Sequence, residues 1–220
     1  SIGDDVTGGS VFHCGLCQAC DEERYAACEN RSELGTGTEP GSFSKFLTVP
    51  STHVYKLPSD LSLECATLAG PLALIVDGIA RVESLFETSN VGVCIVGDGF
   101  LGELAHAYLN QRGYTPSTIN DVASETQLES CQLVIVATAS ERQVQETLRR
   151  TSPGTTIVLL KTELNGTKIH PDDIAEKVLI TAQREGEEHF NDALQSLTDG
   201  NYEQILDGKY SIDQFIADPL

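Results

Sequence analysis

The distribution of apolar and polar positions along the chain changes near residue 60. Before that point the sequence is rich in Gly, Ser and Thr, and two β-like runs, 44–49 and 53–57, are each followed by a proline. From 61 to 85, apolar residues recur at helical spacing, with an interruption at Gly70-Pro71. The pattern therefore predicts an irregular β region followed by a helical segment.

Beyond residue 90, short apolar runs alternate with helical segments. The run V-G-V-C-I-V at 91–96 is short and β-branched enough for a buried parallel strand, and L-V-I-V-A at 133–137 is another. Such alternation is typical of a doubly wound parallel sheet. Further strands are expected at 117–120, 155–160 and 178–181, helices at 103–111, 141–150 and 187–197, and a short turn-and-helix at 210–215.

A glycine motif follows the first of these strands directly and opens a helix. A G-x-G-x-x-G in that context is the fingerprint of a dinucleotide-binding turn. Its first Gly permits a tight turn, its second lets the backbone approach a pyrophosphate, and its third allows close helix packing. A turn kept only for packing is the alternative. The candidate cofactor-binding residues in this motif are Gly97, Gly99, Phe100, Leu101 and Gly102.

Asp121 is the candidate ribose-binding acid, because it lies 19 residues after Gly102 at the end of the second predicted strand. A carboxylate there accepts hydrogen bonds from a ribose diol and repels a 2′-phosphate, and no Arg or Lys follows until Arg142. If a dinucleotide binds, NAD(H) is therefore favoured over NADP(H). Only 11 residues separate Asp121 from Leu133, where a full dinucleotide-binding fold has another strand and helix, so a shortened Rossmann-like sheet is expected.

Four cysteines near the amino end, Cys14, Cys17, Cys20 and Cys28, have the spacing C-x2-C-x2-C-x7-C. Four thiolates on a short loop can close a tetrahedral zinc site and fix a lobe with little core. A ferredoxin-type cluster would have three residues before the fourth cysteine and a proline after it, whereas here seven residues intervene and Glu29 follows. Reduced or disulfide-paired cysteines without a metal are the other alternative. A zinc held by four cysteines has no open position, so it would be structural.

The net charge of −19 narrows the range of partners. It argues against nucleic acid and anionic membrane surfaces, because counterion release needs a basic patch. No signal peptide is visible, and no run approaches the roughly 20 apolar residues of a membrane span. Outside the cluster, Cys94 and Cys131 lie in or beside apolar strands and are expected as buried core thiols, in a reducing, cytoplasmic setting.

Taken together, these motifs resemble the zinc-containing alcohol and polyol dehydrogenases of the medium-chain dehydrogenase/reductase family. The cysteine spacing is similar to that family's structural-zinc lobe, and the position of Asp121 is similar to its NAD-binding acid. The resemblance implies a partial GroES-like β region with a zinc lobe, followed by a Rossmann-like domain. It also rests on short motifs at 3–6, 41–43, 49–50, 56–58, 61–62, 169–171 and 191–200.

We therefore expect an α/β protein in three segments. Residues 1–62 form a partial catalytic-type β region with the zinc lobe, and residues 63–170 form the shortened dinucleotide-binding domain. Residues 171–220 complete the sheet and the β region. The resemblance further implies an oligomer, or a subunit of a larger assembly, with 177–182 as the strand that pairs subunits.

The catalytic residues are unknown at this stage. The family's catalytic zinc takes a cysteine and a histidine from well before the lobe, and only 13 residues precede Cys14. The third ligand, a Glu or Cys, falls at Gly70, which offers no side chain. His13 has the wrong context to replace these ligands. The remaining histidines, His53, His106, His170 and His189, are scattered along the sequence.

Three functions stay open. The first is an NAD(H)-dependent alcohol or polyol dehydrogenase-like protein, without recognisable catalytic zinc ligands, that takes a small-molecule alcohol or carbonyl substrate. The second is a non-catalytic, zinc-stabilised binding or assembly module derived from that family. The third, a zinc-independent reductase, is disfavoured by the cysteine lobe. Binding of NADH is the observation that separates the first from the second.

Overall fold

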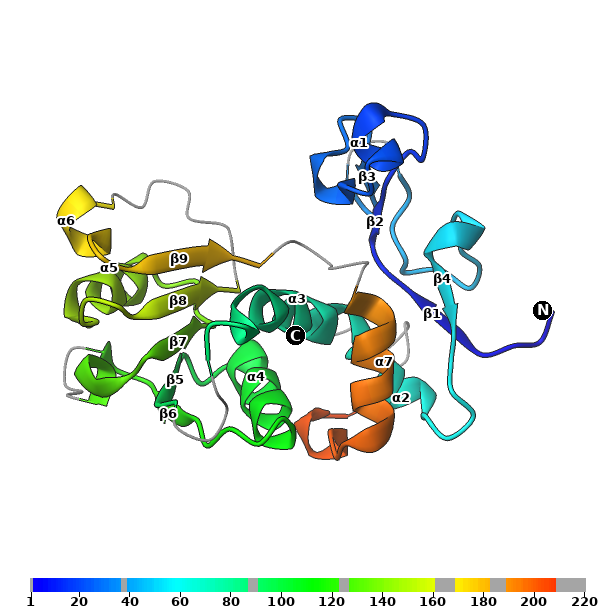
Figure 1. Cartoon of the computed structure of the whole chain (residues 1–220). Helices are drawn as coiled ribbons and strands as arrows, with labels where there is room; N and C mark the ends of the chain where they lie inside the picture. Colours follow the sequence, from blue (N-terminus) through cyan, green and yellow to red (C-terminus); the bar gives the residue numbers. More distant parts are fainter. Residues whose placement is uncertain are drawn as a thin grey trace.

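A five-stranded parallel sheet forms the centre of the fold, with the strand order β6-β5-β7-β8-β9 (Figure 1). The computed structural model describes residues 2–36, 39–86, 91–122, 127–160, 169–182 and 189–208. The strands are β5 (Val93–Val96), β6 (Ser117–Ile119), β7 (Leu133–Val136), β8 (Thr156–Leu159) and β9 (Val178–Thr181).

The topology is that of a doubly wound sheet. From β5 the chain crosses to β6 on one side and then returns to β7 on the other, which creates a topological switch point beside β5. Within the described residues β6 pairs with β5 alone, so it ends the sheet where a longer fold would add a further strand. The predicted shortened α/β sheet is therefore confirmed.

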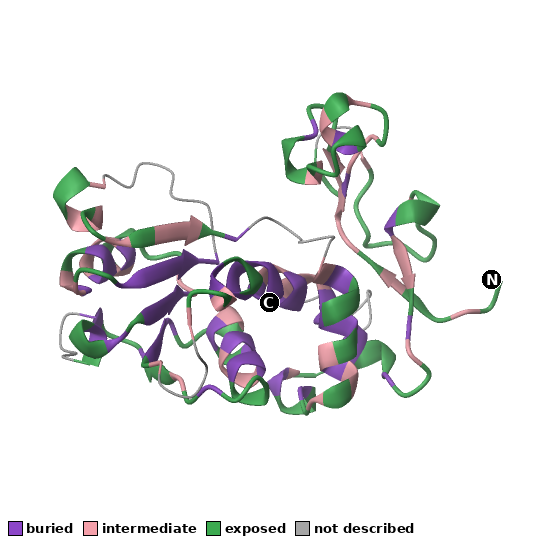
Figure 2. Cartoon of the chain, in the orientation of Figure 1, coloured by how far each residue is buried: buried purple, intermediate pink, exposed green. Residues whose placement is uncertain are grey.

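The three central strands are buried on both faces, as continuous apolar runs require in a parallel sheet. Successive side chains alternate between two cores. Ile95 and Ile135 face α3 (Ala69–Glu83), α4 (Phe100–Gln111) and α7 (Phe190–Asp199). Val96 and Val134 face the opposite layer, which α5 (Glu141–Arg150) covers, with α6 (Pro171–Ile174) beside it. Figure 2 shows this buried centre.

The N-terminal region contains two small antiparallel pairs. Strand β1 (Val6–Gly8) pairs with β4 (Val54–Lys56), and β2 (Val11–Phe12) pairs with β3 (Ser32–Glu33). The lobe beyond β2 is mostly exposed in Figure 2. Its low apolar content means that something other than a hydrophobic core must hold it. The short helices of this half are α1 (Gln18–Asp21), α2 (Leu63–Ala66), η1 (Tyr25–Ala27) and η2 (Ser51–His53).

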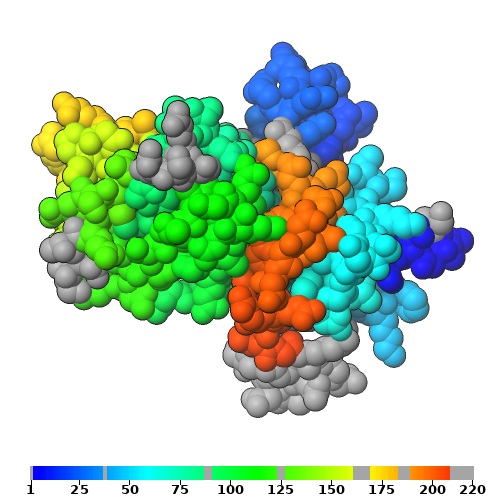
Figure 3. Space-filling model, turned by 60° about the horizontal axis from the view of Figure 1, so that its bottom comes forward, coloured from blue at the N-terminus to red at the C-terminus, as the bar shows by residue number. Residues whose placement is uncertain are grey.

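The last α-helix among the described residues, α7, joins the two halves. The ring of Phe190, at the start of α7, stacks on Tyr55 of β4 with 4.3 Å between ring centroids. Figure 3 shows α7 and the chain after it, which includes η7 (Glu203–Ile205), between α4 and the segment around β4 and α2. The last described segments thus contribute both to the sheet, through β9, and to the contact with the β region.

Three predicted elements differ from the structure. Residues 44–49 form no strand, and only 54–56 of the second run pair. The helical segment breaks at Thr67 and Leu68 and not at Gly70-Pro71, because a proline in the first turn of a helix removes an amide that has no intrahelical partner. The predicted element at 210–215 lies outside the described residues.

The prediction for Cys94 and Cys131 was wrong in one respect. Both are buried, but the structure joins them by a disulfide, with their Cα atoms 6.1 Å apart. Strands β5 and β7 are neighbours, and Cys131 lies just before β7 and after η5 (Gln127–Ser130). A sequence separation of 37 residues therefore becomes a contact through strand pairing that no local pattern reveals.

Candidate functional site

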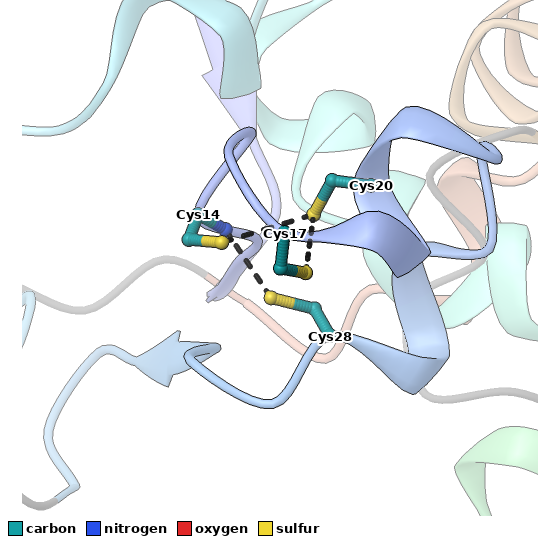
Figure 4. A group of neighbouring side chains, drawn as sticks. All are labelled: Cys14, Cys17, Cys20 and Cys28. Carbon is teal, nitrogen blue, oxygen red and sulfur yellow. Dashed lines mark hydrogen bonds between the residues drawn. The ribbon is translucent and has the colours of Figure 1, made fainter.

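The four cysteines of the lobe come together in space. Cys14 follows β2, Cys17 caps α1, Cys20 lies on α1, and Cys28 follows η1. Their sulfur atoms all lie within 4.8 Å of one another and point toward a common centre (Figure 4). Sulfurs bound tetrahedrally to one zinc ion would be about 3.8 Å apart. The Sγ atoms of Cys17 and Cys20 are 3.5 Å apart, and those of Cys14 and Cys20 are 4.0 Å apart.

Hydrogen bonds and burial shift the pKa values of two of these thiols in opposite directions. The backbone amide of Leu16, opposed by burial, lowers the pKa of Cys14 to about 6. Burial, followed by a hydrogen bond with the neighbouring Cys17 thiol, raises the pKa of Cys20 to about 12. The amide of Cys14 also donates to Cys28 Sγ at 3.4 Å. A divalent cation in the centre would favour four thiolates, so the donor set suits a thiolate-bound metal.

Two histidines meet beside the lobe although 40 residues separate them in the sequence. His13 Nδ1 lies 3.0 Å from His53 Nε2, and the hydroxyl of Thr52 lies 2.9 Å from His53 Nδ1. The Tyr25 ring stacks on His13. Burial, and then the neighbouring His13, lowers the pKa of His53. In the sequence His53 lies far from the cysteine lobe. In the structure its buried side chain packs beside the lobe through the contact with His13.

The glycine motif adopts the backbone that its spacing predicts. Gly97 has φ +113°, a conformation that side chains disfavour, and an added Cβ there would lie 3.0 Å from the Ala137 carbonyl oxygen. A Cβ on Gly102 would lie 2.0 Å from the Gly97 carbonyl oxygen. Gly99 begins α4 with open space around it. The first amides of α4 are therefore accessible to a ligand at the sheet edge.

The other expected cofactor residues surround this turn. Phe100 is half-exposed at the start of α4, and Leu101 is partly buried. Asp121 follows β6 and is exposed. It lines a cavity of about 290 Å³ together with Asn120, Val122, Ser140, Arg142, Gln143 and Glu146. Because α5 begins beside the end of β6, Arg142 reaches the same cavity as Asp121, which the sequence separation concealed.

A larger cavity of about 630 Å³ runs along α4 beside β6. His106 lines it, and its Nδ1 atom lies 2.9 Å from Asn110 Nδ2 on the same helix. Glu103 and Asp98 also line this cavity. Among the described residues, the four cysteines are the one group of three or more potential ligands that converge on a point. No described helix is long and apolar enough to cross a bilayer.

Comparison with known proteins agrees with this architecture. Residues 1–59 match the alcohol dehydrogenase GroES-like domain. The L-threonine 3-dehydrogenase of Shewanella sp. (strain ANA-3) is 32% identical over 148 residues, which are 67% of this chain and 41% of that enzyme. The chain thus spans less than half the length of this relative.

Solved structures share the fold across both halves. The alcohol dehydrogenase rspB from E. coli CFT073, complexed with NADH, superposes with a TM-score of 0.80 at 18% identity and covers 98% of this chain and 72% of its own. A zinc-binding dehydrogenase from Sinorhizobium meliloti 1021, bound to NADP, superposes with a TM-score of 0.73 at 19% identity. The superposition covers 90% of this chain and 66% of that dehydrogenase.

A Rossmann-like sheet joined to a GroES-like region with a four-cysteine lobe defines an alcohol dehydrogenase-like protein. These matches support a dehydrogenase-like protein of the medium-chain dehydrogenase/reductase type, whose chain spans less than half of the L-threonine 3-dehydrogenase that it matches.

Proposed function

We propose that the chain is an NAD(H)-binding, dehydrogenase-like protein whose N-terminal lobe is held together by a structural zinc ion. The glycine turn is the observation that carries this proposal. Gly97 is required by its φ of +113° and by the nearby Ala137 carbonyl after β7, and Gly102 by the close approach of α4 to the end of β5. The space at Gly99 is open, and no packing requires a glycine there. Open space at the second glycine, next to free helix amides, suits a pyrophosphate.

The zinc would be bound by Cys14, Cys17, Cys20 and Cys28. Their convergence within 4.8 Å supports this assignment, and an all-thiolate donor set selects zinc among the common divalent ions of structural sites. With four protein ligands no position stays open for substrate, so this ion would stabilise the lobe and take no part in the reaction.

Asp121 would accept hydrogen bonds from the adenosine ribose, which favours NAD(H). A bound dinucleotide would supply hydride transfer to or from a small-molecule alcohol or carbonyl compound. The similarity to L-threonine 3-dehydrogenase supports a substrate of that kind. The protein's own contribution at this edge would be to orient the dinucleotide through the turn and the carboxylate. We also propose the division of the chain into a β region at 1–62, a dinucleotide-binding domain at 63–170 and a closing segment at 171–220.

Native mass spectrometry with and without NADH tests both assignments. We expect one zinc per chain, and one NADH per chain on addition of the dinucleotide. Asp121→Ala is expected to weaken NADH binding without releasing zinc. A protein that carries zinc but binds neither NADH nor NAD at millimolar concentration would exclude the dinucleotide role and leave the structural one.

The second candidate function is a non-catalytic, zinc-stabilised assembly module. Gly70 favours it, because the position that the family resemblance assigns to a catalytic ligand has no side chain and lies in the first turn of α3. An assembly module would form a stable oligomer without cofactor. Strand β9 is the candidate pairing surface, since it lies at the sheet edge and Val178 is 41% exposed.

Two variants of β9 separate pairing from folding. Leu179→Asp should yield monomer, but Leu179 also packs against the core layer under α5. Val178→Asp places a charge on the more exposed position and should dissociate the oligomer with less effect on stability. Elution volumes equal to that of the unmodified protein for both variants would exclude β9 as the pairing strand.

A cytoplasmic location is also part of this proposal, and four thiols poised for a metal agree with it. The Cys94–Cys131 disulfide does not, because such bonds are rare in reducing compartments. Alkylation of thiols in freshly lysed cells would show which form exists there. Labelled Cys94 and Cys131 would support the cytoplasm.

A further inference from the structure

Side chains of opposite charge line the cavity at the end of β6. Asp121 lies on the strand side, and Arg142 lies in the first turn of α5, which begins after its cap Ser140. Gln143 donates from Nε2 to the Asn120 carbonyl oxygen at 2.6 Å. This bond fixes the first turn of α5 against the end of β6 and so holds Arg142 beside the site proposed for the ribose.

Arg142 differs from the other arginines of the described residues. It makes no hydrogen bond or ion pair within that part of the chain, although the protein is strongly acidic. The others each contact an acidic group or a carbonyl. Arg24 binds Glu22, Arg31 binds the Ala26 carbonyl, Arg81 binds Asp77, Arg112 binds Glu83, and Arg149 and Arg150 bind Glu146.

Glu146 is the second acid of this cavity, but it is already engaged. Arg149 lies 3.5 Å from one of its carboxylate oxygens, and Arg150 lies 3.3 Å from the other. The guanidinium of Arg142 is therefore the positive group in the cavity that intramolecular pairing leaves available for a ligand.

We propose that Arg142 broadens the cofactor specificity of the site. Its guanidinium allows the cavity to accept a dinucleotide that carries a phosphate on the adenosine ribose. The inference rests on the proposed dinucleotide function and extends it. A guanidinium binds phosphate oxygens through two parallel hydrogen bonds and offsets the charge of a neighbouring carboxylate. Asp121 still favours the unmodified diol, so NADH binds more tightly, while NADPH is tolerated and not excluded.

Titration of the zinc-loaded, full chain with NADH and NADPH tests this. Arg142→Gln retains much of the side-chain length and removes the charge, while Arg142→Lys keeps the charge without the planar fork. Arg24→Gln removes the same charge from the exposed surface of the lobe and is the matched control. Isothermal titration with 5′-AMP and 2′,5′-ADP isolates the ribose phosphate from the rest of the dinucleotide.

We expect Arg142→Gln to lower the affinity for NADPH and 2′,5′-ADP by about tenfold, the value of one charge-assisted hydrogen bond. Affinity for NADH and 5′-AMP should change by less than about twofold, and Arg142→Lys should restore part of the loss. Asp121→Asn should raise the affinity for NADPH and lower that for NADH. Because Arg142 is exposed, its contribution should decrease as ionic strength increases.

Three results would overturn the inference while leaving the proposed function intact. One is an unmodified protein that binds NADH but not NADPH. Another is an equal effect of Arg142→Gln on both dinucleotides. The third is an equal loss in Arg24→Gln, which would assign the effect to net charge. If neither dinucleotide nor 5′-AMP binds, the proposed dinucleotide function itself is wrong, and this inference is wrong with it.

Discussion

Gly102 on α4 lies directly over the Gly97 carbonyl, so that a Cβ on Gly102 would be 2.0 Å from the Gly97 oxygen. No rotamer change can relieve such an overlap, because both atoms belong to the backbone framework. The helix packs against the strand end only if this residue has no side chain. A Cβ built on Gly99, three residues earlier, would have open space around it.

This difference gives a matched pair of substitutions. Gly102→Ala should lower the free energy of unfolding by about 1–3 kcal/mol, as overpacking does, and should weaken NADH binding as well. Gly99→Ala should leave stability within about 1 kcal/mol and weaken only NADH binding, because its methyl group intrudes where the pyrophosphate would approach. Denaturant unfolding and NADH fluorescence measure the two effects. Equal stability losses would contradict the distinction.

Removal of metal should loosen the lobe and leave the sheet folded. The lobe at 10–32 has few buried residues, so metal binding is its main source of order. Chelation, or Cys17→Ser, should open this segment to limited proteolysis and release zinc, with little change in the cooperative unfolding of the sheet. Cys65→Ala is the control, because Cys65 is buried on α2 outside the cluster. An unchanged digestion pattern after zinc loss would argue against a structural role for the metal.

Reduction of the Cys94–Cys131 disulfide should destabilise the sheet and leave the lobe intact. The Cys94–Cys131 bond closes a loop of 37 residues, and chain-entropy arguments give about 4 kcal/mol of stabilisation for such a loop. Reduction by a small thiol reagent, or the substitution Cys131→Ala, should therefore lower the stability of the sheet while the lobe keeps its zinc. Mass spectrometry after alkylation reports the bond, and denaturant titration reports its effect. Alkylation of both cysteines before any reductant is added would show that the bond is absent.

Stability at alkaline pH should depend on Tyr108. Burial raises the pKa of its phenol from 10.0 to about 12. Between these values the unfolded chain has released a proton that the folded protein retains, so this stabilisation is complete below pH 10 and is lost as pH rises toward 12. The loss should reach about 2–3 kcal/mol.

Tyr108→Phe removes the ionisable group while keeping the ring. Its unfolding free energy should fall less steeply over the same pH range, as measured by urea denaturation. A slope identical to that of the unmodified protein would mean that Tyr108 does not titrate on unfolding.

Local patterns sufficed for the elements whose information is local. The apolar runs at β5, β7 and β8 have one reasonable assignment, because only buried parallel strands are both so short and so uniformly apolar. The cysteine spacing predicted four sulfur atoms on one short loop, and the third glycine is required by a backbone clash with Gly97 within the motif itself. The short interval between Asp121 and Leu133 likewise anticipated that β6 would end the sheet.

The contacts between residues that are distant in the sequence depend on the three-dimensional packing. Strand order brings Cys94 to Cys131, the start of α5 brings Arg142 to the cavity of Asp121, and the β region brings His13 to His53. None of these pairs has a periodic or short-range signature, since each depends on how strands and helices pack. Local sterics and residue spacing thus account for the strands of the sheet and for the glycine and cysteine motifs. Packing across the sheet and the β region accounts for the pairings between distant residues.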